Sequence, residues 1–139
     1  MKSFCPAVIA AIFFTGAAHA QQSLVGTWKL SGTVAALGQS LHPHHSTDGN
    51  QPRFIAVELT ATIEAQEGNV FHGTMRGPRG SVDRFVGSFS SSGQGVVVND
   101  RGGKYRFTVT SPDRLESVYS LGSKGYLAAA HTIWTRQPK

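Results

Sequence analysis

Three histidines close together are the residues of this sequence best suited to metal chemistry. His42, His44 and His45 lie within four consecutive positions, and Asp48 follows them. Imidazole nitrogens are ligands that Zn²⁺, Cu²⁺ and Ni²⁺ favour, so the segment is a candidate metal site. Adjacent side chains of an extended chain point in opposite directions, which works against joint ligation by His44 and His45. The alternative is a solvated polar loop, since residues 39–53 contain two prolines and have no periodicity.

The usual signatures of catalytic sites are absent from the sequence. It contains no Gly-x-Ser-x-Gly elbow, no His-Glu-x-x-His motif and no phosphate-binding loop. Glu58 and Glu64 lie about 20 Å apart on an extended strand, too far for a glycosidase pair. Asp83 and Arg84 are interpreted as a surface ion pair of little energetic value. The sequence therefore does not indicate an enzyme, and no cofactor is expected.

The first twenty residues have the composition of a secretory signal peptide. A basic residue at Lys2 precedes an apolar run over residues 7–14, and Ala18-His19-Ala20 ends the segment. The run is far shorter than the roughly 20 residues that cross a bilayer, so no transmembrane segment is predicted. We predict a signal peptide over residues 1–20, a single domain over residues 21–139 and a periplasmic or secreted location. An N-terminal core helix is the alternative.

The cysteine count and the charge narrow the chemistry further. The single cysteine, Cys5, falls within the predicted signal peptide, so the mature chain has no disulfide and no thiol nucleophile. The whole chain carries 13 Lys and Arg against eight Asp and Glu. These cations are scattered and mostly alternate with apolar residues, which favours a solvated outer face over a nucleic-acid site. Weak attraction to anionic cell-envelope surfaces is an alternative role for them.

Alternation of apolar and polar residues predicts an all-β fold. The clearest case is residues 54–66, where Ile55, Val57 and Leu59 alternate with polar or small residues. Turn signals separate such segments every 8 to 12 residues. The expected strands cover residues 24–37, 54–66, 70–76, 82–90, 95–98, 104–110, 114–120 and 126–135. We predict an eight-stranded antiparallel up-and-down barrel rather than a sandwich, because closure removes exposed sheet edges.

Two short motifs carry a resemblance to a known superfamily. Gly26-Thr27-Trp28 at the first strand, the eight-strand meander and the ending Trp134-Thr135-Arg136 resemble the calycins, which include lipocalins and avidins. The resemblance implies that Trp28 plugs one end of the barrel and that Arg136 lies across it, so Gly26, Trp28 and Arg136 would be structural residues. The mature chain also resembles small exported bacterial barrel proteins of unassigned function. The middle-strand tryptophans that sandwich biotin in avidins are absent.

The inward-facing aromatic residues are the candidate ligand-binding residues. In a lipocalin-like shell such side chains line a cavity, and the alternative is that they fill the core. They are Phe71, Met75, Phe85, Phe89, Tyr105, Phe107, Tyr119 and Tyr126.

The predicted function is a non-enzymatic, exported, calycin-like binding protein for a small hydrophobic or amphipathic ligand. The alternative is a protein-interaction or inhibitor module of the cell envelope that uses the His-rich loop 41–52 and the basic outer face. A cyclase or isomerase on the same shell is a third hypothesis.

Overall fold

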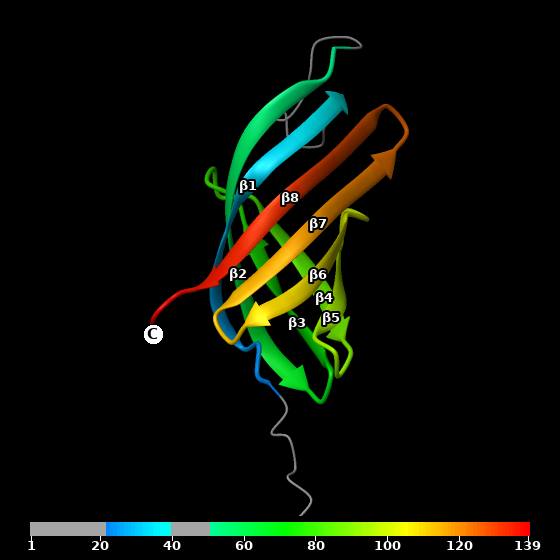
Figure 1. Ribbon diagram of the computed structural model, residues 1–139. Coiled ribbons are helices and arrows are strands. Elements are labelled where there is room, and N and C mark those ends of the chain that lie inside the picture. The colour runs from blue at the N-terminus through cyan, green and yellow to red at the C-terminus, as the bar shows by residue number, and fades with distance from the viewer. Residues whose placement is uncertain (1–21, 40–50) are drawn as a thin grey trace, which may run out of the picture.

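The computed structural model describes residues 22–39 and 51–139, which form a closed β-barrel (Figure 1). Each strand pairs antiparallel with the next, and the last strand pairs with the first. The strands are β1 (Gly26–Gly38), β2 (Arg53–Glu67), β3 (Val70–Arg76), β4 (Val82–Phe89), β5 (Gln94–Asn99), β6 (Lys104–Ser111), β7 (Arg114–Ser123) and β8 (Tyr126–Arg136). The predicted fold class, an eight-stranded antiparallel up-and-down barrel, is therefore confirmed.

The strands differ in length, and this gives the barrel an uneven rim. β1, β2, β7 and β8 are the four longest strands, and Figure 1 shows their ends projecting beyond β3 to β6. We call these projecting ends, residues 34–38, 53–57, 120–123 and 126–130, the lip. β7 runs past its predicted end at Ser120 because it stays paired with β8 as far as Ser123 and Tyr126. No helix in the described ranges is long and apolar enough to cross a membrane.

Glycines of neighbouring strands make room for the phenylalanine rings inside the barrel. The cross-strand partners of Phe71 and Phe85 are Gly87 and Gly73. A Cβ atom at Gly87 would lie 2.3 Å from the Phe71 ring, and one at Gly73 would lie 2.8 Å from the Phe85 ring. The tip of each ring therefore occupies the space that a side chain on the adjacent strand would need, which only glycine leaves open.

Trp28 fills the closed end of the barrel. Its side chain is completely buried, and its indole Nε1 donates a hydrogen bond of 2.9 Å to the carbonyl oxygen of Leu24. The Arg136 guanidinium lies 4.3 Å from the centre of the indole ring. Gly26 has a φ of +137°, and a Cβ atom there would lie 3.1 Å from Arg136 Nη1. The Gly-x-Trp spacing thus lets the chain turn beneath the arginine and insert the indole.

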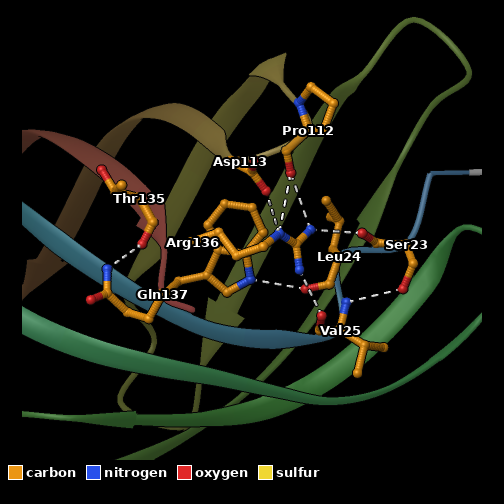
Figure 2. Close-up of polar contacts among 9 residues, drawn as sticks. Ser23, Leu24, Val25, Pro112, Asp113, Thr135, Arg136 and Gln137 are labelled. Atoms are coloured by element: carbon orange, nitrogen blue, oxygen red, sulfur yellow. Dashed lines mark hydrogen bonds and ion pairs between the residues drawn. The ribbon is translucent and has the colours of Figure 1, made fainter. Parts of the chain in front are cut away.

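Arg136 at the end of β8 ties the chain's entry into β1 to the β6–β7 turn (Figure 2). Its Nη atoms donate hydrogen bonds to the carbonyl oxygens of Val25 at 2.7 Å and Ser23 at 2.8 Å. On the other side Nη2 donates to the Pro112 carbonyl oxygen at 3.1 Å, and Nε lies 3.0 Å from a carboxylate oxygen of Asp113. A planar guanidinium can make all these contacts at once, whereas an ammonium group has one nitrogen.

Candidate ligand-binding cavity

The interior of the barrel divides into a packed half and a hollow half. In the packed half, next to Trp28, the Phe71 ring lies 6.2 to 6.4 Å from the rings of three other phenylalanines. These three are Phe85, Phe89 and Phe107. The hollow half lies toward the lip, where the buried apolar residues are Val34, Ala36, Tyr126, Ala128 and Ala130. Because four of these five side chains are short, the same barrel cross-section encloses open space there.

A cavity of about 430 Å³ occupies the hollow half. Pro78 of the β3–β4 turn and Lys124 of the β7–β8 turn border it, so its mouth opens at the end of the barrel opposite Trp28. Thr132, which is 2% exposed, lies among its deeper lining residues. Ligand sites commonly enclose about 300 to 1,000 Å³, so the space suits a small molecule.

One wall of the cavity is polar. Asp83 and Arg101 both line it, and Arg101 Nε lies within hydrogen-bond distance of Asp83 Oδ1. Their side chains are 16% and 34% exposed, so water screens this pair less than it screens a surface pair. Asn99 is buried beside them, and its Oδ1 accepts hydrogen bonds from the backbone N–H groups of Arg101 and Gly103. These contacts fix the β5–β6 turn at the mouth of the cavity.

Two tyrosines, Tyr105 and Tyr119, line the cavity next to the polar wall. The rings of Tyr105 and Tyr119 lie 4.6 Å apart, and the Tyr105 hydroxyl donates a 3.4 Å hydrogen bond to Met75 Sδ. Burial raises the pKa of Tyr105 far above its ordinary value. Burial also raises the pKa of Tyr119 to about 12. Both side chains are therefore neutral phenols at physiological pH, able to donate or accept a hydrogen bond.

A short hydroxyl network forms the polar part of the floor. Trp134 Nε1 donates a 2.9 Å hydrogen bond to Ser117 Oγ, which lies 2.7 Å from Thr132 Oγ1. All three residues are at most 2% exposed. The Trp134 ring also meets Tyr105 edge-on at a centroid distance of 5.6 Å. This contact links Trp134, which does not line the cavity, to a residue that does.

The sequence-predicted ligand residues separate into two groups. Met75, Tyr105, Tyr119 and Tyr126 line the cavity. The four phenylalanines of the prediction, Phe71, Phe85, Phe89 and Phe107, belong to the packed half and do not line the cavity. Alternation along a strand indicates which side chains point inward, but it does not give their height along the barrel axis.

The sequence analysis did not predict the polar wall, although the position of Asp83 in the alternating pattern indicates an inward-facing carboxylate. Asp83 has the same alternation phase as Phe85 and Phe89, which places its carboxylate inside the barrel. The sequence interpretation paired Asp83 with Arg84. The structure instead pairs Asp83 with Arg101, and Arg84 Nε with Asp100 Oδ2 at 3.2 Å, because consecutive strand residues face opposite sides of the sheet.

The candidate metal residues His42, His44 and His45 lie outside the described residues, as does most of loop 41–52. Within residues 22–39 and 51–139, no group of three or more His, Cys, Asp or Glu side chains is placed to hold a metal ion. The metal site and the use of the loop as an interaction surface therefore stay predictions.

A second hollow lies in the barrel wall over strands β4 to β7. It measures about 730 Å³, and Arg106, Glu116 and Val118, which border it, are exposed. This hollow is a broad surface groove that opens to solvent along its length. The smaller cavity is more enclosed and more apolar, and it is therefore the better candidate for small-molecule binding.

The fold and the cavity together define a class: an eight-stranded up-and-down barrel with one plugged end and one hollow, open end. No protein-family model and no curated protein sequence matches the chain. Among solved structures, a de novo designed fluorescence-activating β-barrel is 19% identical, with a TM-score of 0.45, over 85% of this chain and 97% of that one. An S-type phycobiliprotein lyase from Guillardia theta is 14% identical, with a TM-score of 0.35, over 84% and 89%.

Proposed function

We propose that this protein is an exported, calycin-like binding protein that takes a small hydrophobic or amphipathic ligand into the open end of its barrel. The observation that carries the proposal is the cavity of about 430 Å³ opposite the end that Trp28 plugs. Export to the periplasm or secretion is inferred from residues 1–20 of the sequence. Calycin kinship is inferred from Gly26-Thr27-Trp28 and Arg136.

The two walls of the cavity suggest how a ligand would lie. Val34 and Ala130 present an apolar surface, and Arg101 and Asn99 present polar groups on the opposite side near the mouth. Arg101 lines the cavity, and its guanidinium, held by Nε at Asp83 Oδ1, supplies the positive charge of this wall. A molecule with an apolar body and a hydrogen-bond-accepting end matches both walls.

Native mass spectrometry is the direct test of ligand binding. Mature protein is purified without organic solvent, and its mass is measured before and after organic extraction. A bound ligand appears as extra mass that extraction removes. The same mass in both states, together with no fluorescence change across a panel of fatty acids, aromatic acids and haem, would contradict the proposal.

Trp134 is the natural reporter for the titrations because its ring contacts the cavity residue Tyr105 at 5.6 Å. Trp28 lies at the closed end and should respond little. Replacing Trp134 by Phe should therefore remove most of the ligand-dependent signal, while the mass shift persists.

A further inference from the structure

On β1, β2 and β8 the lip is largely apolar on both of its faces. On β8, Ala128 and Ala130 face the cavity while Leu127 and Ala129 face outward. Ala129 pairs with Ala35 of β1, Leu127 pairs with the half-buried Leu37, and Ala35 pairs in turn with Phe54 of β2. A strand that is apolar on both faces is typical of sheets covered on both sides. Here the outer face is in solvent, which marks a surface that a partner would cover.

Phe54 is the most exposed apolar side chain of this surface. It is 84% exposed, and Leu127 on the same side of the lip is 54% exposed. Every other aromatic residue within the described ranges is buried or half-buried. An isolated exposed valine is unremarkable on a protein surface, but a phenylalanine beside a cavity mouth is a candidate anchor.

The open end is also the basic end of the molecule. The described residues near this end include seven cations and only two carboxylates, Asp83 and Asp100. Two of the cations pair with those carboxylates. The remaining five are exposed and have no acidic partner in the part of the chain that the structure describes: Arg53, Arg76, Arg79, Lys104 and Lys124.

The opposite end lacks this excess. Around the plugged end the described residues supply four cations against five carboxylates. The cations are Lys29, Arg114, Arg136 and Lys139, and the carboxylates are Glu58, Glu64, Glu67, Asp113 and Glu116. The barrel therefore has a strong charge asymmetry along its axis. Three of the exposed apolar side chains, Phe54, Val82 and Leu127, lie at the same end as the unpaired cations. Arg53 precedes Phe54, and Val82, which is 42% exposed, pairs with Arg76.

We propose that the open end docks on an anionic lipid surface. Phe54 and Leu127 enter the interface between headgroups and acyl chains, and the five unpaired cations contact anionic headgroups. An exposed aromatic side chain beside scattered lysines and arginines is the chemistry that such an interface accepts. A second copy of the chain fits this end less well, because a symmetric contact would bring two sets of five unpaired cations together. Docking in this orientation sets the cavity mouth against the membrane, and it needs no ligand in the cavity.

Vesicle flotation of the mature, ligand-free protein tests the proposal. The probes are phosphatidylcholine vesicles with and without phosphatidylglycerol. Binding is expected only with the anionic lipid, and it should weaken as salt rises. Neutralising two cations of the open end (Arg79→Gln with Lys124→Gln) should weaken binding about fivefold per charge, or roughly twenty- to thirtyfold together.

The matched control removes the same charge from the opposite end. Arg114→Gln with Lys139→Gln changes two exposed cations near the plugged end and should leave vesicle binding within about twofold. The apolar contribution is tested with Phe54→Ser against Val70→Ser, since Val70 is 54% exposed near the plugged end. Only the Phe54 variant should lose binding.

A tryptophan reporter gives an independent readout of orientation. Both native tryptophans are at most 1% exposed, so a new indole is the only one in water. In Phe54→Trp the fluorescence should shift to the blue when anionic vesicles are added, and in Val70→Trp it should not. Equal losses from the two charge pairs, equal shifts at the two reporters, or no binding to anionic vesicles at low salt would overturn the proposal. So would a concentration-dependent dimer that Phe54→Ser abolishes without any vesicle binding in the parent protein.

Discussion

The two halves of the barrel share strands and hydrogen bonding but are filled by opposite means. In the packed half, large rings lie over glycines, as Phe71 lies over Gly87. In the hollow half, short side chains such as Ala128 and Ala130 line one wall, and the tyrosine rings that also line the cavity leave open space between them. The strand framework therefore sets the diameter of the barrel, and the size of the inward residues decides whether a given height is core or cavity.

The polar groups follow the same division. The packed half is mostly apolar, and the Trp28 indole N–H donates its hydrogen bond to the backbone carbonyl oxygen of Leu24. The hollow half holds Asp83, Asn99 and Arg101 next to apolar walls. The residues that stabilise the fold and the residues that could bind a ligand therefore lie at different heights along the barrel axis. Substitutions in the two halves should have separable effects on folding and on binding.

Removal of the plug is expected to have the largest effect. Trp28→Ala should lower the free energy of unfolding by about 3 to 5 kcal/mol, because it leaves a void and removes the ring beneath Arg136. Urea denaturation followed by far-UV circular dichroism measures the loss. Phe54→Ala, which truncates an 84% exposed side chain, is the control and should stay within about 0.5 kcal/mol of the parent. Similar losses in the two variants would remove Trp28 from its structural role.

The ring-over-glycine packing gives the next largest effect. Gly87→Ala forces a Cβ atom to within 2.3 Å of the Phe71 ring, so it should destabilise the fold by about 1 to 3 kcal/mol. Gly122→Ala is the matched control, because the nearest atom to a Cβ there is 3.9 Å away. Adding Phe71→Leu to Gly87→Ala should cost less than the sum of the single changes. Strict additivity in this double-mutant cycle would show that the ring and the glycine do not contact each other.

Filling the hollow half should separate binding from stability. Ala130→Leu places a larger side chain in the cavity and should weaken binding of the dye 1-anilinonaphthalene-8-sulfonate about tenfold or more, with a change in stability below about 1.5 kcal/mol. Ala129→Leu makes the same change one residue away on the outer face, so it should leave the affinity unaltered. Dye titration and urea denaturation on both variants give the comparison. A parallel decline in both variants would place the dye outside the barrel.

The sequence predicted the strands and the direction of their side chains better than it predicted which inward side chains fill the core and which line the cavity. Inward and outward positions could be read from alternation, as for Ile55 and Val57, and the Gly-x-Trp motif indicated where the plug would lie. Height along the axis could not be read in this way, because it depends on how each strand is offset against its neighbour. The offset places Phe71 opposite Gly87, whereas it places Tyr119 opposite Ala130 beside the cavity.

The polar wall was missed for a related reason. Asp83 and Arg101 are 18 positions apart and meet only because the β4 and β5 strands bring the β5–β6 turn beside the start of β4. In the sequence, the neighbouring Arg84 was the obvious ion-pair partner for Asp83. The inward phase of Asp83 was the one local sign that its partner lay elsewhere.

The smallest effect we predict concerns pH, and it should arise in the hollow half. Burial raises the pKa of Tyr119 to about 12 and that of Tyr105 further, above the value of about 10 for an unfolded chain. The folded protein therefore holds these protons more tightly than the unfolded chain does. This contribution to stability is fully present below about pH 10 and is lost as pH rises through the folded-state pKa values.

Urea midpoints measured with rising pH should be unaffected by tyrosine ionisation below pH 10 and should fall above it, with phenolate absorbance appearing as the chain unfolds. Tyr105→Phe should make the decline shallower, and an unchanged slope in that variant would mean that the buried phenol does not drive alkaline unfolding.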